Sequence, residues 1–204
     1  MEAAFYEIFR KGFQGVSVND IVEKAKLTKG AFFHHFATKQ ALGYALVDET
    51  IRELTLNRWI RPLAAYRNPV RGMLQHLKKI IDQTGEDQLI LGCPLNNLVQ
   101  EMSAVDPIFR EKLQAVLVLW VDEIEKNVRN AQSLGYVRKD INARHAAEFI
   151  VMAHEGFFGI IKGLGDKKIY YSLYESLRIY FDSISVKSSR RERVKGRGRS
   201  DSIR

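Results

Sequence analysis

A short basic segment between Lys24 and Lys39 contains the side chains best suited to bind an anionic polymer. It holds four lysines, at positions 24, 26, 29 and 39, and no Asp or Glu. Such a segment neutralises phosphates, and release of their condensed counterions supplies most of the sequence-independent affinity for nucleic acid. Lysine also reaches the acceptor atoms of guanine, and the amide of the nearby Asn19 can pair with adenine. The chemistry indicated is non-covalent recognition of double-stranded DNA.

Two short helices joined by a tight turn must position these groups. The first has an apolar face at helical spacing, formed by Val18, Ile21, Val22 and Ala25. Ser17 is a suitable N-cap for it, and the pattern breaks at Lys26. Thr28 can cap the second helix, which begins at Lys29 and buries Phe32. This layout is a helix-turn-helix, whose second helix fits the major groove, although periodicity alone also fits two helices of an ordinary bundle.

The same segment resembles the N-terminal domain of the TetR/AcrR family of transcriptional repressors. The residues that carry the resemblance are Gly12, Gly15, the stretches SVNDIVEKA and TKGAFFHHF, and Lys39 to Leu42. The resemblance implies a homodimer that binds a palindromic double-stranded DNA operator. It also implies that the protein leaves the operator when a small-molecule inducer, whose identity the sequence does not reveal, binds in the C-terminal helices.

The resemblance implies two sets of DNA-contacting residues. The positions that face DNA are Asn19, Lys29, Gly30, Ala31, Phe33 and His34, and those that usually hold phosphates are Ser17, Thr28, His35 and Lys39. Two positions depart from the family pattern. Phe33 replaces the more usual Tyr, which removes a hydroxyl that could bond a phosphate. Lys26 replaces a turn Gly, and at positive φ a lysine costs about 1 kcal/mol.

Apolar periodicity predicts an all-α fold of about nine helices. Besides the two of the basic segment, helices are expected over residues 1–11, 39–61, 69–84, part of 88–104, 107–134, 143–164 and 168–185. The expected domains are a helix-turn-helix head of three helices over 1–45, a ligand-binding and dimerisation bundle over 46–186, and a disordered basic tail over 187–204. The first helix is shorter at its start than is usual in the family.

The amino-acid composition limits the classes of protein to which the chain can belong. With 46% hydrophobic residues in 204, the chain can form a sizeable core, and its single cysteine excludes an intrachain disulfide. No apolar run approaches the length of a membrane span, so a soluble cytoplasmic protein is predicted. The tail contains eight basic and two acidic residues and accounts for +6 of the net charge of +8. Residues 1–186 therefore carry a net charge of only +2, and their positive patch is confined to the segment between Lys24 and Lys39.

Candidates for a ligand pocket come from the resemblance together with side-chain type. They are Trp59, Tyr66, Met73, His76, Cys93, Asn97, Trp120 and His154, with Asn96 and Phe109 as further possibilities. For each of them, ordinary packing or surface exposure is the alternative. Cys93 lies in the stretch Gly-Cys-Pro-Leu-Asn-Asn-Leu, which resembles a segment that lies near the ligand pocket in members of the family. Some of those members sense electrophiles. A thiol at a helix N-terminus is expected to have a lowered pKa; the alternative is a buried, unreactive cysteine.

The last two helices have apolar stripes that suit a helix–helix interface. The stripes include Phe149, Ala153, Gly156, Phe157 and Ile160 in one helix, and Leu173, Leu177, Tyr180 and Ile184 in the other. An intrachain hairpin explains the periodicity equally well, but the resemblance favours a four-helix interface between two chains. A two-fold dimer places two recognition helices about one DNA turn apart, which is how a palindrome is read.

Enzymatic function is not expected. The sequence lacks the His-x-x-Glu-His, Gly-x-Ser-x-Gly and phosphate-loop motifs, and its five histidines lack metal-ligand spacing, so neither cofactor nor metal is predicted. Two alternatives to a repressor stay open. One is a transcriptional activator of the same family. The other is a dimer that binds nucleic acid nonspecifically through the basic tail. The alternative for the tail itself is that it only increases solubility.

Overall fold

The computed structural model describes residues 1–186, apart from the side chains of residues 86 and 87. Within that range the chain is helical, and the β-type pairing is a single bridge between Val137 and Ser185. The predicted all-α fold is confirmed. None of the helices in this range is long and apolar enough to cross a membrane. The basic tail predicted over 187–204 lies outside the described residues.

The N-terminal head consists of α1 (Glu2–Lys11), α2 (Val18–Ala25) and α3 (Lys29–His35). Helix α1 ends at Gly12, which has a φ of +81°, a conformation that favours glycine. The three helices meet around a small apolar centre, to which each contributes. Its buried members include Ala4, Ile8, Phe13, Val16, Ile21, Val22 and Phe32.

A long helical segment leads from the head into the rest of the molecule. It consists of α4 (Lys39–Ala45), η1 (Leu46–Ile51), α5 (Arg52–Thr55) and η2 (Leu56–Ile60), and a 3₁₀ turn, η3 (Arg61–Ala65), ends it. We call α4 to η2 the linker helix. It was predicted as one helix over 39–61, but η1 and η2 have wider, π-type turns. The Thr55 hydroxyl donates to the Ile51 carbonyl, and such back-bonding is known to bend helices.

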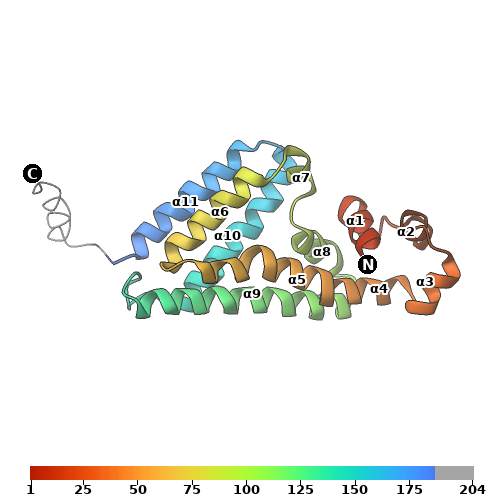
Figure 1. Ribbon diagram of the computed structural model, residues 1–204, viewed down its shortest axis with the longest axis horizontal. Coiled ribbons are helices and arrows are strands. Elements are labelled where there is room, and N and C mark those ends of the chain that lie inside the picture. Colours follow the sequence, from red (N-terminus) through yellow and green to blue (C-terminus); the bar gives the residue numbers. More distant parts are fainter. Residues whose placement is uncertain (187–204) are drawn as a thin grey trace, which may run out of the picture.

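The remaining helices form the bundle. They are α6 (Pro69–Gln83), α7 (Glu86–Leu91), α8 (Pro94–Met102), α9 (Pro107–Ser133), α10 (Ala143–Leu164) and α11 (Lys168–Ile184). Proline occupies the first turn of α6, α8 and α9, where its missing N–H leaves no hydrogen bond unmade. Figure 1 shows α9 running alongside the linker helix, while α6, α10 and α11 cross above them. Helix α7 is a short addition that was not predicted as a separate element.

Three contacts join the head and the start of the linker helix to the bundle. The Phe13 ring packs edge-on against Phe109 at the start of α9, with centroids 4.7 Å apart. The Tyr44 hydroxyl donates to Asp106 Oδ2 at 2.8 Å. The carboxylate of Glu101, in α8, accepts the backbone N–H groups of Phe13 and Gln14, each at 2.8 Å. We call these three contacts the head–bundle junction.

Candidate nucleic-acid interface and ligand cavity

Helix α3 presents most of the predicted DNA-contacting residues on its outer surface. Thr28 caps it as expected, since its Oγ1 accepts the Ala31 N–H at 3.1 Å. Phe32 anchors the helix in the head, with 5% of its surface exposed. The exposed residues of the predicted set are Ser17, Asn19, Thr28, Lys29, Gly30, Phe33, His34 and His35, while Ala31 is half-buried. An added Cβ at Gly30 would meet only the Thr28 hydroxyl, at 3.7 Å, so the backbone there is open to a close approach.

Ser17 forms a complete capping box with Asp20 at the start of α2. Its Oγ accepts the Asp20 N–H at 3.2 Å, and Asp20 Oδ2 accepts both the hydroxyl and the backbone N–H of Ser17. The two hydrogen bonds that Asp20 accepts lower the pKa of its carboxyl, and the one from the Ser17 hydroxyl has the larger effect. The capping role of Ser17 is confirmed. Its hydroxyl proton is already bonded within the head, so a phosphate contact requires a rearrangement.

Lys39 takes a different place from the one the resemblance implies. Its ammonium donates to the carbonyls of Phe13 and Val16 at 2.9 and 2.8 Å and lies 4.7 Å from the centre of the Phe13 ring. The side chain thus fastens the α1–α2 loop to the start of the linker helix. Lys26 has a φ of +55°, the condition under which a lysine at this position is strained, and it is exposed.

Thr38 is a local determinant that the sequence interpretation missed. Its hydroxyl oxygen accepts the Ala41 N–H at 3.0 Å and caps α4, directly after the recognition helix. A signal was present, because Thr38-Lys39-Gln40-Ala41 repeats the pattern Thr28-Lys29-Gly30-Ala31 that caps α3.

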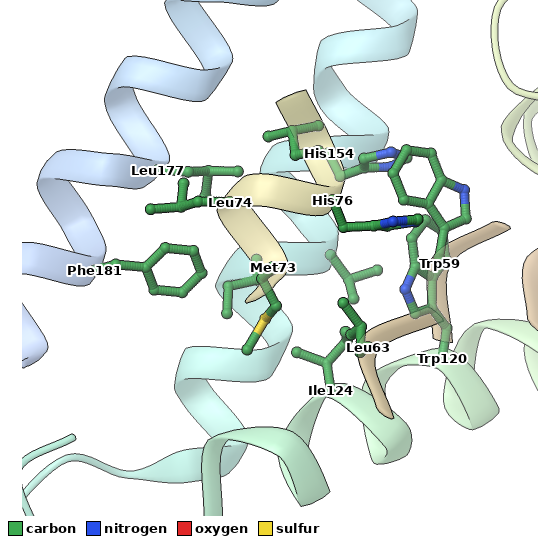
Figure 2. Close-up of a pocket in the computed structure, with 13 residues that line it drawn as sticks. Trp59, Leu63, Met73, Leu74, His76, Trp120, Ile124, His154, Leu177 and Phe181 are labelled. Atoms are coloured by element: carbon green, nitrogen blue, oxygen red, sulfur yellow. The ribbon is translucent and has the colours of Figure 1, made fainter. Parts of the chain in front are cut away.

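The helices enclose two neighbouring cavities. The smaller, of about 50 Å³, lies between the linker helix, α6, α9, α10 and α11 and is shown in Figure 2. The larger, of about 690 Å³, lies between α1, the linker helix, α7 and α8. Trp59 and Trp120 line both cavities, with their rings stacked 5.8 Å apart.

Five of the eight predicted ligand residues come together at the smaller cavity. These are Trp59, Met73, His76, Trp120 and His154. Cys93 lines the larger cavity instead, together with polar groups that were not predicted: Thr55, Arg58, Thr84 and Gln88.

The other candidates have structural roles. Tyr66 packs against Gly72, and Phe109 belongs to the head–bundle junction. The Asn97 side chain donates to the Leu91 carbonyl and accepts a hydrogen bond from Lys162. The Asn96 side chain donates to the Glu155 carbonyl.

Cys93 corrects an expectation. It is the N-cap of α8, as its position before Pro94 suggested, but it is buried, with 7% exposed. Burial, reinforced by the negative charge of Glu155, raises the pKa of the thiol far above its usual range. The N–H groups of Leu95 and Asn96 act in the opposite direction but more weakly. The expected lowering of the pKa is therefore wrong, because desolvation outweighs the helix N-terminus.

We expect the native thiol to react slowly. Its reaction with a soluble aromatic disulfide at neutral pH should be at least about 100-fold slower in the native protein than in denaturant, since both thiolate and access are lacking. The measurement is the release of the coloured thiol over time. Equal rates in the two states would contradict this prediction and restore the electrophile-sensing hypothesis.

The predicted interface stripes divide into two groups. Phe157, Leu173, Leu177 and Ile184 are buried within the chain's own bundle, with at most 9% exposed, so their assignment to an intermolecular surface is wrong. Phe149, Gly156 and Ile160 face solvent, and Ala153 and Tyr180 are half-buried. The exposed surface also includes Leu164, which belongs to the predicted stripe, and Met152 and Ile179, which were not predicted. Periodicity identified the helices but not which stripe turns inward.

A three-helix head whose third helix is exposed and basic is joined by one long helix to an apolar bundle with cavities between its helices, and this combination defines a class of protein. The protein is a non-enzymatic, helix-turn-helix DNA-binding regulator of transcription. Residues 1–46 match the family described as bacterial regulatory proteins, tetR family, and residues 69–177 match the tetracyclin repressor-like C-terminal domain. The chain belongs to the TetR family of transcriptional regulators.

Individual relatives agree with this assignment. An uncharacterized HTH-type transcriptional regulator of Lactococcus lactis is 26% identical over 180 residues, which cover 88% of this chain and 90% of that one. The HTH-type transcriptional repressor DhaR of Mycobacterium sp. (strain GP1) is 28% identical over 72% of each chain. A TetR transcriptional regulator from Chloroflexus aurantiacus has the same fold, with a TM-score of 0.78, 24% identity and coverage of 90% and 92%.

Proposed function

We propose that this protein is a ligand-responsive transcriptional repressor. A homodimer binds a palindromic operator through α3 of each head and leaves it when a small molecule occupies the bundle. The observation that carries the proposal is the linker helix. It begins four residues after the recognition helix, at Lys39, and contributes Trp59 to both cavities. A ligand in either cavity therefore touches the element that holds the head. The relative named DhaR is called a repressor, which favours repression over activation.

Helix α8 supplies a second connection between cavity and head. Its first residues, Pro94 and Leu95, line the larger cavity, and Glu101 near its other end binds the loop after α1. A rigid helix that moves at one end must move at the other. Two elements thus link ligand occupancy to the position of the head, as a coupling between distinct sites requires.

Dimerisation is supported by the outer surface of α10. Met152, Ile160 and Leu164 are each more than half exposed. Apart from neighbouring residues of α10 itself, no atom of the described residues lies within 4 Å of a Cβ built at Gly156, Gly159 or Gly163. Apolar side chains beside bare glycines allow another helix to approach closely, and a patch of this kind marks a protein interface. The occupant we propose is α10 of a second copy, which sets the two α3 helices in a fixed spacing for a palindrome.

The test is binding to DNA from upstream of the protein's own coding region, at fixed salt, with random DNA as competitor. We expect a complex that survives the competitor and is weakened at least about tenfold by Lys29→Ala. Lys79→Ala is the matched control, because Lys79 is an equally exposed lysine on the bundle. Deleting residues 187–204 should weaken specific and random DNA alike.

A second arm tests the dimer. Ile160→Glu should bind the operator weakly and sediment as a monomer, whereas Ile90→Glu, which replaces an isoleucine of nearly the same exposure on α7, should remain dimeric. Binding that is lost to the competitor, and depends on the tail but not on Lys29, would replace this proposal with the nonspecific alternative.

A further inference from the structure

The smaller cavity has one wall that carries its polar groups and an opposite wall that is wholly apolar. Figure 2 shows His76 and His154 beside the indole of Trp59, with Leu177 and Phe181 on the opposite side. Among the residues that the structure describes, no Lys, Arg, Asp or Glu lines the cavity. An ionised ligand would lose its hydration there without a charge to compensate it. The occupant that suits this cavity is therefore uncharged and mostly apolar.

His154 has an unused hydrogen-bonding atom in this wall. The residue is 5% exposed, and its Nδ1 lies 3.1 Å from Glu155 Oε1. Because a carboxylate accepts, the Nδ1 that faces Glu155 carries a proton, and in this tautomer Nε2 is the acceptor. That Nε2 is buried and has no partner among the described residues. His76 differs, since its Nε2 already donates to the Arg58 carbonyl at 2.6 Å. A ligand that donates one hydrogen bond would satisfy His154.

Aromatic rings surround His154. The centroids of Trp59, Phe158 and Trp120 lie 4.0, 4.8 and 4.9 Å from that of the imidazole, all in edge-on arrangements. Edge-on and offset contacts are the ones that aromatic rings prefer with one another. A flat ring that carries a hydroxyl group matches these walls better than an alkyl chain does.

The present volume of the smaller cavity decides how such a ring enters. About 50 Å³ is well below the roughly 150 Å³ of an apolar cavity that admits benzene. Trp59 and Trp120 line both this cavity and the larger one of about 690 Å³, so a turn of the Trp59 side chain toward the larger cavity would enlarge the smaller one. Trp59 belongs to η2, so its movement acts on the linker helix.

We propose that the bundle binds an uncharged phenol. The ring packs against Trp59 and Trp120, the hydroxyl donates to His154 Nε2, and Trp59 moves into the larger cavity. The effect on DNA rests on the proposed function, in which movement of the linker helix releases the operator.

The test uses intrinsic fluorescence and calorimetry on the full chain without DNA. Both tryptophans of the sequence lie in the cavity wall, so the whole tryptophan signal reports on the site. The probes are phenol, anisole, toluene and benzoate. Anisole keeps the ring and its oxygen but cannot donate. We expect the Kd for phenol to be at least about tenfold lower than for the other three, with a change in tryptophan emission.

His154→Phe should reduce the preference for phenol over anisole to within about twofold, whereas His145→Phe, at an exposed histidine of the same helix, should leave it unchanged. The comparison of probes in the natural protein needs no variant, so a misfolded His154→Phe does not weaken the test. Equal affinity for phenol and anisole, tightest binding of benzoate, or absence of binding would overturn the proposal. If phenol binds as expected but leaves the operator complex intact, ligand-induced release fails and the phenol site stands.

Discussion

Replacing Glu101 by alanine is expected to lower the free energy of unfolding by about 1.5–3 kcal/mol and to weaken operator binding. The carboxylate accepts two backbone N–H groups, of Phe13 and Gln14, each at 2.8 Å, and hydrogen bonds to charged groups contribute this much. Without Glu101, both N–H groups lose their partner and the head–bundle junction loses one of its three contacts. The measurement is thermal unfolding, where each kcal/mol corresponds to about 2–4 °C for a chain of this size.

Two variants make this experiment specific. Glu111→Ala removes the same charge from an exposed position in α9 and should change neither stability nor DNA affinity appreciably. Glu101→Gln retains one carbonyl oxygen and should fall between the alanine variant and the natural protein. If the amides of Phe13 and Gln14 exchanged their hydrogens equally slowly in Glu101→Ala, the proposed role of this carboxylate would be wrong.

Gly43→Ala is expected to destabilise the protein, although alanine usually favours a helix. Gly43 is buried in α4 between the head and α9, and a Cβ there would lie 2.5 Å from Phe13 Cε2 and still closer to the ring of Phe109. Both rings are at most 2% exposed and have no space to retreat. Overpacking of this kind costs about 1–3 kcal/mol, which outweighs the roughly 1 kcal/mol gained in helix propensity.

The matched control is Gly30→Ala, also in a helix but with open space around its Cβ. It should raise the unfolding midpoint slightly, since alanine restricts the unfolded chain more than glycine does. The two variants thus change the midpoint in opposite directions. A rise in both would show that the contact of Gly43 with the two rings is looser than described.

Local features were predictable because they depend on neighbours in the sequence. Ser17 and Thr28 cap the helices they were expected to cap, and α10 has the predicted bounds, 143–164. Helix α9, at 107–133, nearly matches the predicted 107–134 for the same reason, since apolar residues recur at helical spacing along it.

Contacts between distant segments were not predictable from one sequence. Glu101 binds Phe13 and Gln14, which lie 88 and 87 positions before it in the sequence. Neither the residue type of Glu101 nor its place in the helical pattern distinguishes it from a surface glutamate. The ammonium of Lys39 was assigned to phosphate, whereas it binds carbonyls of the head. Cys93 shows a further limit of local reasoning. Its place at a helix N-terminus was predicted, but its burial and the nearby charge of Glu155 in α10, which together raise its pKa, were not.

The sequence separation across the head–bundle junction bears on how the molecule assembles. Contacts inside the head join residues close in the chain, while the hydrogen bonds of Glu101 close a loop of almost half its length. Loop closure over such distances is entropically costly and slow, so we expect the head and the bundle to fold first and dock last. The docking step is then also the first to reverse under native conditions. Movements that regulate proteins are drawn from this least stable part of the structure.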